Sequence, residues 1–196
     1  MNDELDKLLN KIKALEDELV EELQKQQEEF SYEIRRRTIY FEKNIILRHR
    51  RYAKALFRYI SEAPLKHIMT APVVWFCLIP ALTLDLSVSL YQAVCFPAYG
   101  IPKVNRQDYI VFDRRYLNYL NLIEKLNCAY CSYFNGLIGY IQEIAARTEQ
   151  FWCPIKHAHR IKNLHSRYRN FLNYGDADSY RRRIESVRRN FTDLEK

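Results

Sequence analysis

The chain has 196 residues, which is enough for one domain of ordinary size or for a small domain with extensions. It contains only four glycines and six prolines, which argues against a β-sandwich, a β-barrel or a long disordered tail. The cysteines number five, and residues 1–20 do not resemble a signal peptide, so a secreted disulfide framework is disfavoured. We therefore expect reduced thiols that face the cytoplasm.

The net charge of +7 is unevenly distributed along the chain. Residues 1–96 carry 14 basic and 14 acidic side chains, whereas residues 97–196 carry 17 basic and 10 acidic ones. This excess predicts an acidic partner surface for the C-terminal half, either anionic membrane lipid or nucleic acid. No nucleic-acid-binding signature accompanies the arginines, so lipid is the simpler interpretation.

Residues 2–62 are predicted to form one long helix. A coiled-coil seam with alternating steps of three and four residues begins in its first turns, at Leu5, Leu8, Ile12, Leu15 and Leu19. The seam then continues past Leu23. A lone charged helix is the alternative interpretation. The seam predicts a homo-oligomer, or a partner membrane protein that binds through this helix.

The second half of this predicted helix is strongly basic. Nine arginines and lysines fall within residues 35–58, directly before an apolar segment. Basic clusters beside a membrane are attracted to anionic lipid by roughly 1 kcal/mol per charge. The pattern therefore also favours a lipid surface.

Residues 64–100 form the apolar segment. The 17 residues of 68–84 carry no formal charge, which is about the minimum for a membrane span. Ten aliphatic or phenylalanine residues in 72–90 favour insertion by about 3 to 6 kcal/mol, whereas a central Asp85 opposes it by about 3 kcal/mol. The segment is therefore a marginal span in which Asp85 needs a partner. A core helix of a soluble bundle is the alternative.

Basic residues flank the apolar segment on both sides, so its orientation is ambiguous. A single span is one possibility. A re-entrant hairpin bent near Pro80 is the other, and it agrees better with reduced thiols and a basic C-terminal half. The hairpin would leave both termini in the cytoplasm.

Helical spacing resumes after the apolar segment. Residues 101–153 are predicted to form a helical module, in which Asn135, Gly136 and Gly139 bend or break the helix. Residues 154–196 are predicted to be a basic helical tail. It comprises a helix over 154–173, a turn at 174–176 and a final arginine-rich helix that Asp176 or Asp178 could cap. The predicted class is all-α, with a coiled-coil-like helix over 1–63, a membrane-embedded segment or hairpin, and a C-terminal helical bundle.

One cysteine pattern could carry chemistry. Cys128 and Cys131 are spaced to share one face of a helix, and Cys153 and His157 follow later in the chain. Three thiolates and an imidazole would suit zinc or an iron–sulfur cluster. A straight helix would separate Cys131 from Cys153, so a shared site needs a fold-back near Gly136 or a second chain. The alternatives are a redox pair at Cys128 and Cys131, or inert buried thiols.

The central two-fifths of the chain resembles an uncharacterised family of bacterial proteins. The resemblance rests on YQAVCFPAYGIPKV, DYIVFD and LNCAYCSYFNGLIGYIQEIAARTEQFWCPIKHA. It implies a bacterial source, and hence the inner membrane as location, but no activity and no catalytic residue.

The sequence therefore predicts a membrane-anchored oligomeric scaffold or accessory subunit. The alternative is a membrane-associated metal or iron–sulfur protein with an electron-transfer or redox role. No glycine-rich phosphate loop, catalytic triad order or dinucleotide fingerprint occurs, so no catalytic residue is predicted.

Overall fold

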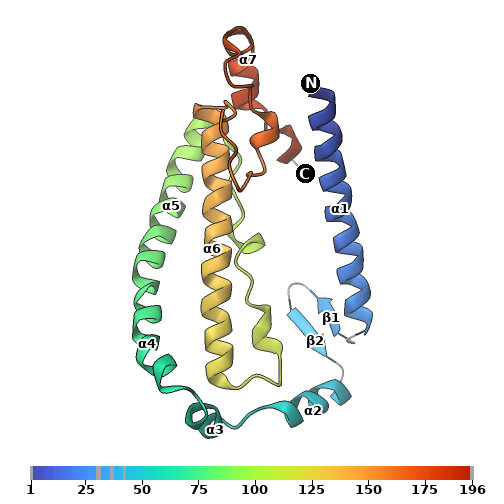
Figure 1. The fold of residues 1–196 in the computed structure, drawn as a ribbon, viewed down its shortest axis with the longest axis vertical. Helices are drawn as coiled ribbons and strands as arrows, with labels where there is room; N and C mark the ends of the chain where they lie inside the picture. Colours follow the sequence, from blue (N-terminus) through green and yellow to red (C-terminus); the bar gives the residue numbers. More distant parts are fainter. Residues whose placement is uncertain (1, 30–31, 36–37, 42, 195–196) are drawn as a thin grey trace. The chain divides into compact units, whose positions relative to one another are not determined.

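The computed structural model describes residues 2–29, 32–35, 38–41 and 43–194. Helices account for most of this part of the chain, which confirms the predicted helical class in its main feature (Figure 1). The chain divides into two compact units. The first comprises Met1–Ala63 and Phe112–Ala129, and the second comprises Pro64–Val111 and Tyr130–Lys196.

The first unit does not contain the single long helix expected over residues 2–62. Helix α1 ends at Glu29, and an antiparallel hairpin follows in which Tyr32 pairs with Phe41. Residues 30–41 are rich in aromatic and β-branched types, which favour strands over helix. Heptad counting overlooked this preference. The elements are α1 (Asn2–Glu29), β1 (Tyr32–Arg35), β2 (Thr38–Phe41), α2 (Lys43–Tyr52) and α3 (Leu56–Ser61).

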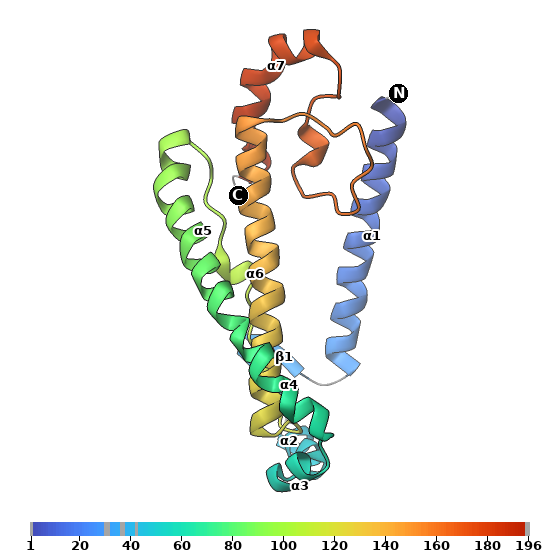
Figure 2. The same cartoon turned by 60° about the vertical axis from the view of Figure 1, so that its left-hand side comes forward.

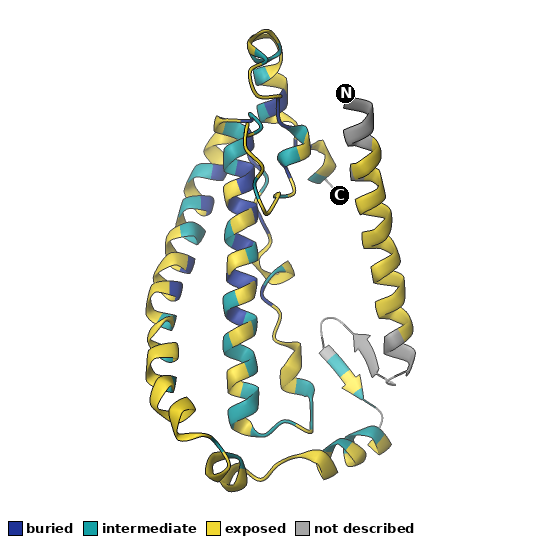
Figure 3. Cartoon of the chain, in the orientation of Figure 1, coloured by how far each residue is buried: buried dark blue, intermediate teal, exposed yellow. Residues whose placement is uncertain are grey.

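The predicted seam of α1 is open to solvent. Its apolar side chains have 49–64% of their surface exposed, at Leu8, Ile12, Leu15, Leu19 and Leu23 (Figure 3). The side chain of Leu5 lies outside the described part, as do Arg36 and Arg37 of the basic run. Within the first unit, no described residue covers this part of the seam.

The rest of the first unit is held by ring contacts. His49 on α2 lies between Phe41 and Tyr119, with ring centroids 5.2 and 5.1 Å away. Strand β2 also contacts the short helix η2 (Asp113–Tyr116).

In the second unit the apolar segment forms two nearly continuous helices, α4 (Leu65–Phe76) and α5 (Leu78–Tyr99). Only Cys77 separates them, and its backbone is itself helical (Figure 2). Pro80 causes the interruption because it has no N–H to donate to the Phe76 carbonyl. The chain does not reverse there, so the expected hairpin near Pro80 is wrong. By length and composition Leu65–Tyr99 could cross a membrane, and the described residues contain one such helix.

Helix α6 (Leu122–Trp152) follows the same direction as α4 and α5. Successive contacts along the pair join Tyr130 to Val74, Tyr133 to Asp85 and Tyr140 to Gln92. The chain must therefore return between the two helices, and residues 101–111, here called the return segment, pack against both. The core lies where the three meet, at Phe96, Ile101, Val104, Ile110, Leu137, Tyr140 and Ile144.

Helix α6 is unbroken at Gly136 and Gly139, contrary to the expected bend. Because these glycines have no side chain, the return segment can instead pack closely against α6. A Cβ at Gly136 would lie 2.5 Å from the Tyr109 carbonyl oxygen and 2.8 Å from Ile110 Cα. Both are backbone atoms, which cannot move aside as a flexible side chain can.

We expect Gly136→Ala to destabilise the second unit by up to about 2 kcal/mol. Alanine favours helix over glycine by about 1 kcal/mol, but overpacking against fixed backbone costs roughly 1–3 kcal/mol. Gly139→Ala is the matched control, because its Cβ would meet a Tyr109 ring carbon at 3.2 Å. Urea denaturation in mild detergent measures both variants. A Gly136→Ala protein as stable as the Gly139→Ala protein would contradict the close approach.

The tail after α6 differs from the expected basic helix over 154–173. Residues 153–167 have no helix, and Ile155 instead forms a parallel bridge with Leu172. Lys156 N donates to the Leu172 carbonyl at 2.8 Å, so long-range pairing replaces helical hydrogen bonds. The turn and cap are confirmed: Gly175 has φ +81°, and Asp176 accepts a hydrogen bond from Ser179 N. The elements of the tail are η3 (Tyr168–Asn170), α7 (Ala177–Arg189) and η4 (Thr192–Leu194).

Candidate functional site

The four predicted metal ligands do not form one site within the chain. Cys128 and Cys131 are on α6, Cys153 follows its last residue, and His157 is in the loop beyond. With α6 unbroken, Cys131 and Cys153 are roughly 33 Å apart at 1.5 Å per residue. The fold-back that a shared zinc or iron–sulfur site requires is absent here. Among the described residues no group of three or more His, Cys, Asp or Glu could hold a metal ion.

The thiols and His157 have separate environments. All five cysteines are free, and Cys131 and Cys153 are exposed. His157 stacks on Tyr168, and its Nε2 lies 3.8 Å from Glu149. The alternative of two buried, inert thiols at Cys128 and Cys131 therefore does not describe Cys131.

Asp85, the charged residue of the apolar segment, has its partner within the chain. Arg106 of the return segment donates to both carboxylate oxygens, from Nη2 at 2.6 Å and from Nε at 3.3 Å. Tyr133 Oη on α6 donates at 2.9 Å and Ser89 Oγ at 3.4 Å. Asp85 is buried, so this fork of donors replaces the water that the carboxylate loses.

Two further polar clusters continue along the same seam. Gln92 accepts from Val104 N at 2.6 Å and donates to Tyr140 Oη at 3.0 Å. Arg147 pairs with Glu143 at 2.8 Å and donates to the Pro102 carbonyl at 2.7 Å. Each cluster joins the return segment to α5 or α6, so together the three fix an irregular backbone against two helices.

Sequence reasoning identified Asp85 but missed its partners. Sequence reasoning treats Arg106 only as one of the basic residues that flank the apolar segment, and it gives Tyr133 no role. The available signal was the requirement for a nearby cation, because a buried carboxylate in an apolar segment needs one. Nothing in the spacing identified which of the following basic residues would supply it.

Electrostatics favour an ionised Asp85. Burial would raise the pKa of its carboxyl, but hydrogen bonds from Arg106 and Tyr133 outweigh burial and hold that pKa below the ordinary 3.8. Burial and the bond to Asp85 raise the pKa of Tyr133 to about 12. Both carboxylate oxygens are engaged by donors, which suits a fixed structural ion pair better than a proton-transferring group.

We expect Arg106→Gln to lower the free energy of unfolding by about 2 kcal/mol at pH 7. Removing one partner of a buried pair costs roughly 3–5 kcal/mol, and the 45% exposure of the Arg106 side chain reduces this. Urea denaturation measures the effect, with Lys103→Gln as the charge-matched control.

The double variant Asp85→Asn/Arg106→Gln should recover part of the loss, because no unpaired carboxylate remains. If Arg106→Gln and Lys103→Gln were equally stable, the ion pair would not hold the return segment.

Comparisons of the chain with models of protein families, with curated proteins and with solved structures found no match. Function is therefore inferred from the geometry and chemistry of the chain itself.

Proposed function

We propose that the protein is a membrane-attached helical scaffold without catalytic activity of its own. The observation that carries this proposal is the apolar outer side of α4 and α5. Large side chains there have 52–73% of their surface exposed and recur every three or four residues, at Met69, Val73, Phe76, Ile79, Leu82, Leu86, Leu90 and Val94 (Figure 3). The strip extends for roughly 37 Å at 1.5 Å per residue, which is far more exposed apolar surface than a soluble monomer normally tolerates.

The return segment favours attachment at the bilayer surface over a membrane crossing. Apart from the short 3-10 helix η1 (Arg106–Asp108), it is irregular backbone that packs along α5, and it exposes Lys103, Arg106 and Asp108. Irregular backbone exposed to lipid does not occur in the hydrocarbon region, because its polar groups would lack partners. A helix lying in the interface would instead immerse its apolar strip by about 5–10 Å and leave the return segment in water.

Helix α1 supplies the scaffold role in this proposal. Its exposed leucine and isoleucine seam has coiled-coil spacing, so a second copy or another helical protein could cover it. The metal or redox alternative has no comparable support in the described residues, because its four ligands are not brought together.

The test of surface attachment counts how many introduced cysteines of each molecule react with a label from outside a vesicle. A double variant, Lys66→Cys/Lys103→Cys, is made in a chain whose five native cysteines are serines, and is reconstituted into sealed lipid vesicles. Lys66 and Lys103 are exposed near the two ends of the apolar segment. A membrane-impermeant maleimide then reacts from outside, and mass spectrometry reports the labels per molecule.

Surface attachment predicts molecules with two labels or none, according to their orientation. A crossing helix predicts one label on every molecule, and that result would overturn the surface orientation. Detergent-solubilised protein is the control and should carry two labels throughout. Wild-type protein should also stay in the membrane pellet after a carbonate wash, because its apolar strip is immersed in the bilayer, and its release would overturn that immersion.

A further inference from the structure

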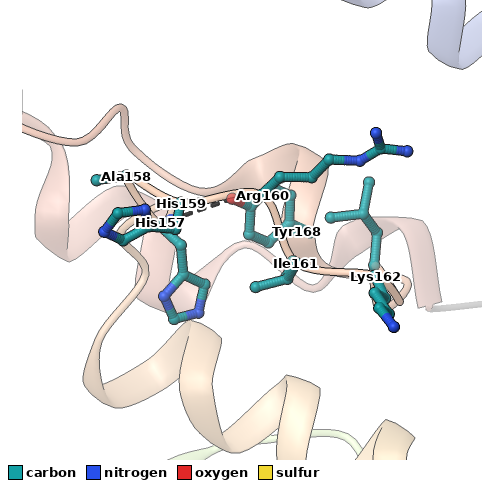
Figure 4. Close-up of a pocket in the computed structure, with 8 residues that line it drawn as sticks. His157, Ala158, His159, Arg160, Ile161, Lys162 and Tyr168 are labelled. Carbon is teal, nitrogen blue, oxygen red and sulfur yellow. Dashed lines mark hydrogen bonds between the residues drawn. The ribbon is translucent and has the colours of Figure 1, made fainter.

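A cavity of about 430 Å³ opens in the loop that follows α6 (Figure 4). Four nitrogen-bearing side chains line it together with one phenol, at His157, His159, Arg160, Lys162 and Tyr168. Ile161 and Leu164 add an apolar part. Its size is within the ordinary range for small-molecule sites.

The two basic side chains of this cavity are not neutralised. Arg160 and Lys162 form no salt bridge with any other described residue, and both are exposed. One acidic group, Glu149, contacts a histidine of the cavity: its carboxylate lies 3.1 Å from His165 Nε2 and 3.8 Å from His157 Nε2. Glu149 is thus directed chiefly to His165, and the cavity keeps a net positive charge.

One wall of the cavity is held in place by specific side-chain contacts. The His157 ring is stacked on the Tyr168 ring at 6.4 Å with an interplanar angle of 11°. Tyr168 Oη also accepts a hydrogen bond from His157 N at 3.0 Å (Figure 4). Arg167, the residue before Tyr168, is almost fully buried and hydrogen-bonded, so Tyr168 is attached to a rigid element.

An aromatic cluster lies at the ends of α5 and α6, where α6 leads into the loop that lines the cavity. Tyr99 stacks on Phe151 at 5.1 Å and contacts Trp152 edge-on at 5.3 Å, and Trp152 is 55% exposed. His157 touches the last turn of α6 through Glu149. Exposed tryptophan and tyrosine are enriched where a membrane meets water, at the level of the lipid headgroups.

We infer that this cavity binds a phosphate group. Unpaired arginine and lysine, with imidazole N–H groups beside them, are the donors that recognise phosphate oxygens. The aromatic cluster at the end of α6, with its exposed Trp152, favours the headgroup of an anionic lipid as the source, and a free phosphate ester offers the same chemistry. The inference does not depend on how α4 and α5 contact the membrane.

The experiment titrates full-length protein in an uncharged detergent with two probes, dioctanoyl phosphatidic acid and inorganic phosphate, by calorimetry. Arg160→Gln/Lys162→Gln should weaken phosphatidic acid binding at least about tenfold, since two charge-assisted contacts are removed. Arg181→Gln/Arg183→Gln on α7 removes the same charge from an exposed helix outside the cavity and should bind as wild type does. Circular dichroism verifies the fold of each variant.

The two probes distinguish the sources. If phosphatidic acid binds, and inorganic phosphate neither binds nor competes with it, the ligand of the cavity is a lipid headgroup. Competition by inorganic phosphate assigns it to soluble phosphate esters. Failure of both probes to bind wild-type protein, or an equal loss in the α7 variant, would overturn the inference. None of these readouts requires membrane attachment, so the two proposals can fail independently.

Discussion

Replacing Arg167 with methionine is expected to lower the free energy of unfolding by about 3–5 kcal/mol. Arg167 has 1% of its surface exposed. Its guanidinium donates to Gln150 Oε1 at 2.6 Å and to both oxygens of Asp193, at 2.6 and 3.0 Å. A methionine fills most of the volume but satisfies none of these acceptors, so Gln150 would lose its partner in the interior and the partly exposed Asp193 would lose its two-pronged partner.

Arg169 provides a matched control for this substitution. It also contacts Asp193, at 3.3 Å, but its side chain is 49% exposed. Arg169→Met should therefore change stability by less than about 1 kcal/mol. Urea denaturation of the two variants compares a buried and an exposed arginine that share one carboxylate. If both variants lost the same free energy of unfolding, burial would not be the cause of the large effect expected at Arg167.

The ion pair between Arg167 and Asp193 also predicts that the free energy of unfolding depends on pH. The hydrogen bond from Arg167 holds the pKa of Asp193 below its ordinary value of 3.8, despite partial burial. A carboxyl whose pKa is lower in the folded state contributes stability that is present above pH 3.8 and is lost as the pH falls through the folded pKa. The wild type should therefore lose stability below about pH 4 more steeply than Arg167→Met does. Parallel curves would contradict this linkage.

Arg167 also explains why the loop after α6 has a defined shape without helix. Gln150, fully buried in α6, donates to the carbonyls of Val187 and Asn190 at 2.9 and 2.7 Å. Arg167 donates to the Asn190 carbonyl as well, at 3.0 Å. The loop and the end of α7 thus share one hydrogen-bond network anchored on α6, and this network supports Tyr168 beside the phosphate cavity.

Sequence patterns predicted the elements whose signals are local. The apolar segment over 64–100 corresponds to α4 and α5, and the helical module predicted over 101–153 contains α6. The cap at Asp176 was also correct, because an N-cap depends on a few neighbouring residues. The hairpin at β1 and β2 was missed because the heptad spacing continued through residues whose side-chain types favour strands.

The contacts that sequence reasoning missed are long-range. Arg106 meets Asp85 across 21 residues and Arg167 meets Asp193 across 26, and no periodicity encodes either distance. The cysteine pattern illustrates the same limit. Correct spacing at Cys128 and Cys131 indicated possible ligands, but the unbroken α6 carries Cys153 away from Cys131. Gly136 and Gly139 suggested a bend, whereas their small size serves the return segment.

The second large effect is expected from Leu82→Lys/Leu86→Lys on the outer strip of α5. The two leucines are 52% and 73% exposed, so within the chain they lose little packing when replaced. In contact with lipid each would bury its side chain, which is worth about 1.5–3 kcal/mol. Losing both should weaken membrane binding by about 3–6 kcal/mol, a factor of a hundred or more.

Flotation with vesicles of uncharged phosphatidylcholine measures this binding without help from the added positive charge. The control, Gln142→Lys/Ala145→Lys, adds the same charge to exposed positions of α6. Wild-type and control proteins should float, and the α5 variant should stay at the bottom of the gradient with unchanged helicity in detergent. Because the substituted leucines contact little of their own chain, a loss of flotation would report on lipid contact and not on unfolding. An α5 variant that floats as well as the control would place the apolar strip against protein instead of lipid.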